Sequence, residues 1–153
     1  MRKQSAGILL YRFVDDRLEV LLTHPGGPYW ARKDEGAWTI PKGEFEEDED
    51  ALTAAWREVE EELGSRPVAS RVLALAPVRQ RGGKIVHAWA AQADFDPASL
   101  QSNTFTVEWP PRSGRMREYP EVDRAAWMTV AEARHKMLAA QVPLLDALER
   151  LLG

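Results

Sequence analysis

The feature that most constrains this chain is an acidic stretch from Gly43 to Gly64, GEFEEDEDALTAAWREVEEELG. Because an α-helix advances by about 100° per residue, each position can be placed around the helix axis. If Glu58 is set at zero, Glu62 lies at roughly 40° and Glu61 at roughly −60°. The adjacent sector holds the apolar residues Leu52, Ala55, Trp56, Val59 and Leu63. Three carboxylates are therefore expected on one helix face, at the border of the buried face.

This clustering of carboxylates has two interpretations. Like charges three and four residues apart cost a helix a few tenths of a kcal/mol per pair, which favours a missing counter-charge. A hard divalent cation such as Mg²⁺ takes oxygen ligands and is often held by a few carboxylates together with substrate phosphates. Alternatively, the run is a solvated acidic face, as most charge runs are. On these residues alone both interpretations remain open.

The spacing within the stretch favours the metal site. The fixed positions, in order, are Gly43, Glu49, Arg57-Glu58-Val59, Glu61-Glu62 and Gly64. This pattern resembles the signature of the Nudix hydrolases, and every glycine, glutamate and arginine of that signature is present. The signature closes with an aliphatic residue, whereas Ser65 stands there in this chain. That difference concerns packing at the helix end rather than the chemistry.

The resemblance implies a role for each residue of the motif. Mg²⁺ or Mn²⁺ would be bound by Glu58, Glu61, Glu62 and the backbone carbonyl of Lys42. Arg57 would pair with Glu49 and orient the glutamates. The other interpretation of that pair is an ordinary surface ion pair that contributes little.

Members of this family often supply a further acid from a later loop, as a metal ligand or general base. The segment EVDRAAW resembles that region, so Glu121, six residues before Trp127, is preferred over Glu118. The predicted catalytic residues are therefore Glu61, Arg57, Glu49 and Glu121. The sequence contains no nucleophile beside a base, which favours direct attack by water.

The rest of the chain alternates strand-like and helix-like segments. Residues 6–13 and 18–23 predict a β-hairpin with a four-residue loop at 14–17. Further strands are expected at 38–40, 72–78, 84–91, 104–109 and 125–128. Helices are expected at 130–137, capped by Thr129, and from Pro143 onward. The order predicts an α/β fold, and the resemblance implies a Nudix-type α/β/α sandwich on a mixed β-sheet, with residues 1–153 as a single domain.

Composition limits the partners and the compartment. The formal net charge of −4 disfavours binding to nucleic acid through a basic surface. The chain has no cysteine, which excludes disulfides and thiolate metal sites and fits a reducing compartment. The apolar run near the N-terminus ends before Arg12, too early for a signal peptide or a membrane span. A cytoplasmic protein that does not bind membranes is expected.

Basic and aromatic residues outside the motif are candidates for substrate binding. Lys42 lies beside the motif, and the segment 102–120, predicted to be a long functional loop, carries Arg112, Arg115 and Arg117, which suit phosphate binding. Trp109, Tyr29 and Trp30 could stack on a base. Trp38, Trp56, Trp89 and Trp127 are assigned to the core.

The segments WTIPKG and GKIVHAWAA resemble the diadenosine polyphosphate hydrolases within the Nudix family. The predicted function is therefore a metal-dependent pyrophosphohydrolase acting on a dinucleoside polyphosphate such as diadenosine tetraphosphate. The open alternatives are a (d)NTP or ADP-ribose pyrophosphatase, a non-catalytic Nudix-like nucleotide sensor and a metal buffer. A monomer and a homodimer are equally compatible with the sequence.

Overall fold

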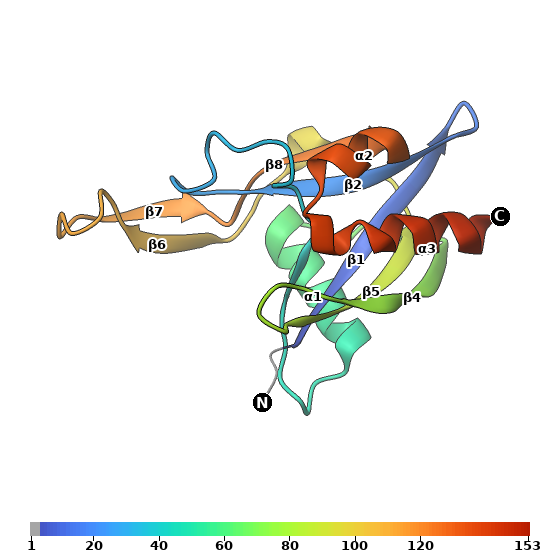
Figure 1. Ribbon diagram of the computed structural model, residues 1–153, viewed down its shortest axis with the longest axis horizontal. Coiled ribbons are helices and arrows are strands. Elements are labelled where there is room, and N and C mark those ends of the chain that lie inside the picture. Colours follow the sequence, from blue (N-terminus) through green and yellow to red (C-terminus); the bar gives the residue numbers. More distant parts are fainter. Residues whose placement is uncertain (1–3) are drawn as a thin grey trace.

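A mixed β-sheet forms the centre of the computed structural model, which describes residues 4–153 (Figure 1). Its strand order is β4-β5-β1-β2-β8, with β3 paired to β1. The pair β1 and β5 is parallel, and the other pairs are antiparallel. The strands are β1 (Gln4–Val14), β2 (Arg17–Pro25), β3 (Lys42–Glu44), β4 (Arg71–Arg79), β5 (Ile85–Gln92), β6 (Thr104–Glu108), β7 (Met116–Pro120) and β8 (Val122–Thr129).

Helices cover both faces of the sheet, so the predicted α/β sandwich on a mixed sheet is confirmed. The helical elements are α1 (Ala51–Leu63), α2 (Val130–Lys136) and α3 (Pro143–Leu152), with short 3₁₀ turns η1 (Pro97–Ser99) and η2 (Ala139–Gln141). Helix α1 packs through Ala55, Val59 and Leu63 against Ile8 and Leu10 of β1. Helix α3 covers the opposite face, where Leu144, Leu145 and Leu148 join the cluster that contains Leu9, Tyr11 and Val20.

Local sequence explains where α1 begins and ends. The Asp50 side chain caps the helix by accepting from the Thr53 backbone N–H at 3.0 Å. Gly64 ends it with a left-handed φ of 88°, and its N–H donates to the Glu60 carbonyl at 2.8 Å. The two ends of the helix are therefore fixed by Asp50 and Gly64. In the same way, Thr129 caps α2 through a reciprocal capping box with Glu132.

One predicted turn and one predicted strand differ from the structure. The β1–β2 connection contains only Asp15 and Asp16, with φ of 51° and 65°, so the predicted four-residue loop is wrong. Aspartate tolerates this left-handed backbone, which the tightest hairpin turns require. The strand predicted at residues 38–40 is wrong: Trp38 and Thr39 make only isolated bridges, and the next strand along the chain, β3, begins at Lys42.

The segment 102–120 differs in part from the prediction: the strand expected at 104–109 is present as β6, but the rest is not a long loop, because a second strand, β7, follows. Strands β6 and β7 pair with each other as a separate two-stranded sheet, with Thr104 opposite Pro120 and Glu108 opposite Met116. Figure 1 shows this hairpin projecting away from the main sheet. The sequence of β7, MREYP, lacks a clear apolar alternation, so its strand character comes from pairing with β6 rather than from its own pattern.

Among residues 4–153, no helix is both long and apolar enough to cross a membrane. The first three residues of the basic N-terminal segment lie outside the described residues.

Candidate active site

The most strongly connected pair of the site is Arg57 and Glu49. The Arg57 guanidinium donates to both Glu49 carboxylate oxygens, each at 3.1 Å. The third guanidinium nitrogen, Nη1, lies 3.1 Å from Glu58 Oε1 and 3.5 Å from Glu61 Oε1. The pairing predicted for Arg57 and Glu49 is therefore present. Because a two-pronged pair fixes the guanidinium plane, Arg57 holds the two α1 carboxylates from one side.

Glu58 lies against the loop that enters the helix, in space that exists because residue 43 is glycine. A Cβ built on Gly43 would lie 2.1–2.2 Å from the carboxyl atoms of Glu58. The Glu58 residue is only 9% exposed, although its neighbours on the acidic face are half-buried. The signature glycine therefore provides the room in which this carboxylate sits.

Glu62 faces the same loop at Lys42. The Lys42 backbone N–H donates to Glu62 Oε1 at 3.3 Å. Gly7 of β1 allows the loop to pass, since a Cβ there would lie 2.5 Å from the Pro41 carbonyl oxygen and 2.6 Å from Lys42 Cβ. The fold thus brings Lys42 to the helix face that carries Glu58 and Glu62.

The α1 carboxylates carry more negative charge than the nearby cationic groups, Arg57 and Lys42, neutralise. Burial, followed by the Glu61 carboxylate, raises the pKa of Glu58 to about 6, although Arg57 opposes this. Burial and the Glu58 carboxylate raise the pKa of Glu62 to about 8, against the opposing effect of Lys42. Both shifts indicate that these carboxylates would gain from an added cation.

Lys42 is the basic group at the centre of this cluster. Burial, followed by the Lys84 ammonium, lowers the pKa of Lys42, whereas Glu62, Glu44 and Glu58 raise it. Lys84 itself pairs with Glu44 at 3.3 Å. The Lys42 ammonium therefore interacts with the carboxylates of α1, and the Lys84 ammonium acts on Lys42 and pairs with Glu44 of β3.

Glu121 reaches the same end of α1 through backbone hydrogen bonds. The Glu121 N–H donates to the Asn103 carbonyl at 2.7 Å, and the Asn103 N–H donates to the Glu61 carbonyl at 2.9 Å. The Glu121 carboxylate also acts on Glu62, whose pKa it helps to raise. Glu118 instead lies on β7, opposite Thr106. Of the two acids considered, Glu121 is the one tied to α1.

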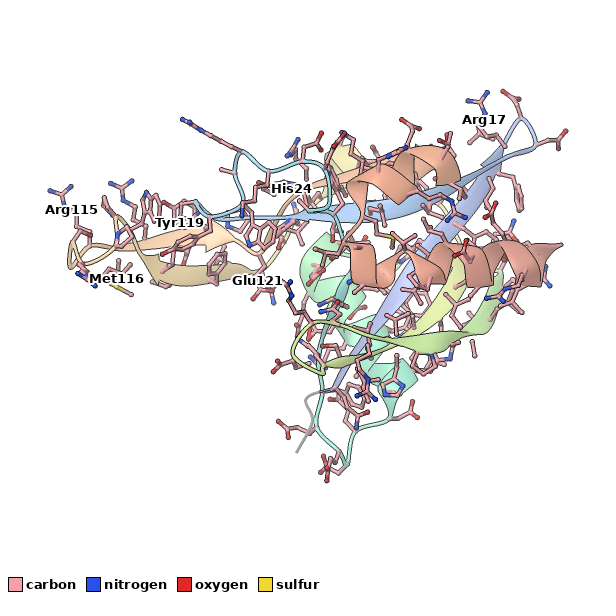
Figure 2. The ribbon with its side chains drawn as sticks, viewed as in Figure 1. Arg17, His24, Arg115, Met116, Tyr119 and Glu121 are labelled. Carbon is pink, nitrogen blue, oxygen red and sulfur yellow. The ribbon has the colours of Figure 1, made fainter. Side chains whose placement is uncertain are left out.

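The three arginines of the hairpin do not lie beside the carboxylates. Figure 2 shows Arg115 at the far end of the β6–β7 hairpin, whereas Glu121 lies at its base. At about 3.4 Å per residue, the six steps from Glu121 place Arg115 roughly 20 Å away along the strand. Arg112 occupies the same distal turn, and Arg117 pairs with Val107 within the hairpin.

The predicted aromatic residues divide into two groups. Tyr29 and Trp109 contact each other edge to face, with ring centroids 5.2 Å apart, and the Tyr29 residue is 56% exposed. Trp30 packs against the core on the α3 side of the sheet, with the Lys33 ammonium 5.0 Å from its ring. Tyr29 is therefore the exposed member of this set, whereas Trp109 and Trp30 are each partly buried.

Some residues that position the site were not predicted from the sequence. Gly26 donates its N–H to the Glu121 carbonyl at 2.8 Å, and a Cβ on Gly26 would lie 1.9 Å from the Pro120 carbonyl oxygen. A Cβ on Gly27 would meet the Phe105 ring at 2.7 Å. The dense HPGGP sequence predicted only a break in regular structure. Its glycines instead let the hairpin pack against the end of β2.

A model of the NUDIX domain family matches residues 1–148. The chain belongs to the Nudix family. The expectation of a Nudix hydrolase, drawn from the motif between Gly43 and Gly64, is confirmed at the level of the family.

Solved structures of Nudix proteins share the fold of this chain. A Caenorhabditis elegans Ap4A hydrolase in a binary complex is 23% identical with a TM-score of 0.66, and the match covers 98% of this chain and 97% of that one. The NUDIX domain of Shewanella oneidensis NrtR, complexed with ADP ribose, is 18% identical with a TM-score of 0.68, covering 100% and 90%. The Escherichia coli ORF135 protein is 24% identical with a TM-score of 0.58, covering 99% and 93%.

Proposed function

We propose that this Nudix protein is a divalent-metal-dependent pyrophosphohydrolase that cleaves a phosphoanhydride bond of a nucleoside polyphosphate. The observation that carries the proposal is the group of carboxylates on one face of α1. Arg57 and Glu49 fix Glu58 and Glu61 from one side, and the Lys42 loop contacts Glu62 from the other. A structural helix has no need of such a set, because its like charges repel one another.

The metal would be Mg²⁺ or Mn²⁺, held by Glu58, Glu61, Glu62 and the backbone carbonyl of Lys42. Within residues 4–153, no three carboxylate or imidazole groups already form a closed metal-binding cluster. Oxygen-only donors nevertheless fit a hard cation, and Mg²⁺ normally keeps several waters and binds substrate phosphates. When bound, such an ion neutralises phosphate charge and lowers the pKa of a coordinated water.

Each of the chain's own groups has a proposed task. Arg57 keeps the Glu58 and Glu61 carboxylates oriented through its bond to Glu49. A Glu121 carboxylate oxygen accepts the proton of the attacking water, since it lies near Glu62 at the end of α1. The ammonium groups of Lys42 and Lys84 attract the phosphates to the same place.

We further propose a dinucleoside polyphosphate, such as diadenosine tetraphosphate, as the preferred substrate. The likeness to the Ap4A hydrolase supports this choice through the shared fold. The Tyr29–Trp109 pair, in which Tyr29 is exposed, offers an aromatic surface on which a base could stack. Arg112, Arg115 and Arg117 lie farther along the same hairpin, where only an extended ligand could use them together with the α1 carboxylates.

The runner-up is binding or cleavage of ADP-ribose. It is favoured by the likeness to the NrtR NUDIX domain solved with ADP ribose. Shewanella oneidensis NrtR was also solved in complex with a 27mer DNA, but the match covers only 61% of that chain. A nucleotide sensor has no use for the full set of carboxylates, which favours hydrolysis. That the chain is a single domain that binds no nucleic acid stays a prediction.

Incubation with a nucleotide panel tests both parts of the proposal. Diadenosine tetraphosphate, ATP, dGTP and ADP-ribose are each supplied with Mg²⁺, and the products are identified by mass. The proposal predicts hydrolysis only with metal, and the highest kcat/KM for diadenosine tetraphosphate. Metal-dependent cleavage with ADP-ribose as the best substrate would overturn the substrate but not the reaction. Binding without cleavage of any nucleotide would overturn the reaction.

A further inference from the structure

Gln141, the last residue of η2, is completely buried, and both ends of its side-chain amide are hydrogen-bonded. Its Oε1 atom accepts from the Ile40 backbone N–H at 3.0 Å, and its Nε2 atom donates to Gln80 Oε1 at 2.9 Å. A backbone N–H can only donate, so the oxygen of the Gln141 amide must face Ile40 and the nitrogen must face Gln80. The chemistry proposed above for α1 does not use this glutamine.

The contact with Ile40 supports the segment that leads into β3. A strand-like segment directs the backbone groups of successive residues to opposite sides. Here Trp38 bonds on one side to the chain at the end of α2, and Thr39 bonds on the other side to β2. The N–H of Ile40 is directed to the first side again, where the Gln141 side chain accepts it. Gln141 therefore supplies the acceptor that a neighbouring strand would supply.

The supported segment ends at the α1 site. Ile40 lies two residues before Lys42, whose N–H donates to Glu62 Oε1 at 3.3 Å. Between them, the Pro41 carbonyl accepts from Ile8 of β1 at 3.1 Å. Because proline restricts its own backbone, these three residues move largely as one unit. A displacement of Ile40 is therefore carried to the Lys42 backbone.

The other end of the Gln141 amide reaches the β4–β5 turn. Gln80 begins this turn, where its N–H donates to the Lys84 carbonyl at 2.7 Å and its carbonyl accepts from the Gly83 N–H at 3.0 Å. The Lys84 ammonium in turn pairs with Glu44 of β3 at 3.3 Å. Gln141 thus joins the segment that precedes β3 to the turn that carries Lys84.

We propose that Gln141 is a positioning residue for the α1 site. Its bond to Ile40 holds the Lys42 backbone against Glu62, and its bond to Gln80 fixes the place of the Lys84 turn relative to that backbone. The effect on the backbone stands by itself. The consequence for metal binding rests on the proposed function, in which the Lys42 carbonyl is a ligand.

Two substitutions at position 141 separate hydrogen bonding from packing. Gln141→Met has a side chain of similar length but leaves the Ile40 N–H and the Gln80 carbonyl without this partner. Gln141→Glu keeps both contacts. In its acid form one oxygen accepts from Ile40 and the hydroxyl donates to Gln80, and in its ionised form the Gln80 amide turns over and donates. Leu152→Ala shortens a partly buried side chain of α3 and is the control for loss of core packing.

The first test is amide hydrogen exchange in the whole, metal-free protein, with the amides of β1 as the internal reference. Relative to that reference, exchange at Ile40, Lys42 and Gly83 should be roughly tenfold faster or more in Gln141→Met, because buried groups lose their partners. Gln141→Glu and Leu152→Ala should keep the wild-type ratios. No change at Lys42 would overturn the positioning role, and no change at Gly83 would overturn the link to the Lys84 turn.

The second test is Mn²⁺ binding to the nucleotide-free protein, measured by electron paramagnetic resonance of the free ion. Affinity should fall roughly tenfold or more in Gln141→Met, the range for losing a group that orients a metal ligand. It should stay near the wild-type value in Gln141→Glu and Leu152→Ala. The Mg²⁺ concentration for half-maximal hydrolysis should shift in the same way, with a much smaller change in kcat at saturating Mg²⁺.

Equal Mn²⁺ affinity in Gln141→Met and the wild type would overturn the consequence for metal binding. An equal loss in Gln141→Glu would overturn the role of the hydrogen bonds. If the wild type neither binds Mn²⁺ nor hydrolyses a nucleotide, the proposed function fails, and exchange at Lys42 still decides whether Gln141 positions this segment.

Discussion

At the scale of single residues, Gly43 shows how one missing side chain creates the site. The Glu58 carboxyl occupies the place that a Cβ at position 43 would need, at 2.1–2.2 Å. Gly43→Ala should therefore displace Glu58 and lower kcat by on the order of 10², the range for losing one stabiliser of a transition state. Steady-state kinetics with Mg²⁺ measure the effect.

The matched control for that variant is Gly82→Ala in the β4–β5 turn. No atom lies within 4 Å of a Cβ at Gly82, so its substitution strains only a positive-φ backbone. It should cost about 1 kcal/mol of unfolding free energy and leave kcat unchanged. If Gly43→Ala keeps the wild-type kcat, the cradle for Glu58 has no catalytic importance.

At the scale of elements, the connection between β7 and β8 brings Glu121 to the end of α1, whereas Glu118 stays within β7. Glu121 is tied to Asn103 and Gly26. Glu121→Gln should lower kcat far more than it raises KM, because the role proposed for this carboxylate is to accept the proton of the attacking water. Glu118→Gln is the control and should retain wild-type kinetics. The reverse ranking of the two variants would assign the base to β7.

An element can be predicted from the sequence when the residues that determine it lie within the element itself, and not when they lie far away along the chain. Helix α1 carries its own signals, with Asp50, Gly64 and an apolar stripe, so its bounds and its acidic face follow from local rules. Strand β7 has no such pattern and depends on pairing with β6. The contribution of Gly26 depends on contact with Pro120, 94 positions farther along the chain, and no local pattern contains it.

The same distinction applies to the site. Glu49 and Arg57 were predicted to pair because the motif fixes their spacing, and the structure contains that pair. The three hairpin arginines are candidates for phosphate binding only because of their residue type. Their distance from the α1 carboxylates depends on how the hairpin projects from the main sheet, which no local sequence pattern gives.

At the scale of the whole molecule, we expect the projecting hairpin to favour long substrates over short ones. Arg117→Ala and Arg115→Ala should lower kcat/KM for diadenosine tetraphosphate by about tenfold or more, since a charge-assisted bond contributes about 1.5–3 kcal/mol. Both should leave kcat/KM for ATP within about twofold, because only an extended ligand is expected to span the hairpin and the α1 site. Equal losses for both substrates would contradict this division.

The charge balance of the molecule without metal gives another test. Burial and Glu58 raise the pKa of Glu62, so its ionised form is disfavoured in the folded protein. Glu62→Gln should therefore raise the Tm of the metal-free protein by a few degrees. Mg²⁺ should raise the Tm of the wild type and have a much smaller effect on the variant. Equal shifts on adding Mg²⁺ would place the ion elsewhere.

The most direct test of the central claim compares kcat for Glu61→Gln, Glu62→Gln and Glu60→Gln at saturating nucleotide and Mg²⁺. Glu60 belongs to the same helix turn, but its side chain is exposed on another face. The account predicts losses on the order of 10² or more for Glu61→Gln and Glu62→Gln, and wild-type kcat for Glu60→Gln. Circular dichroism should show all three folded. Near-wild-type kcat in Glu61→Gln or Glu62→Gln, or an equal loss in Glu60→Gln, would contradict a metal site on this face of α1.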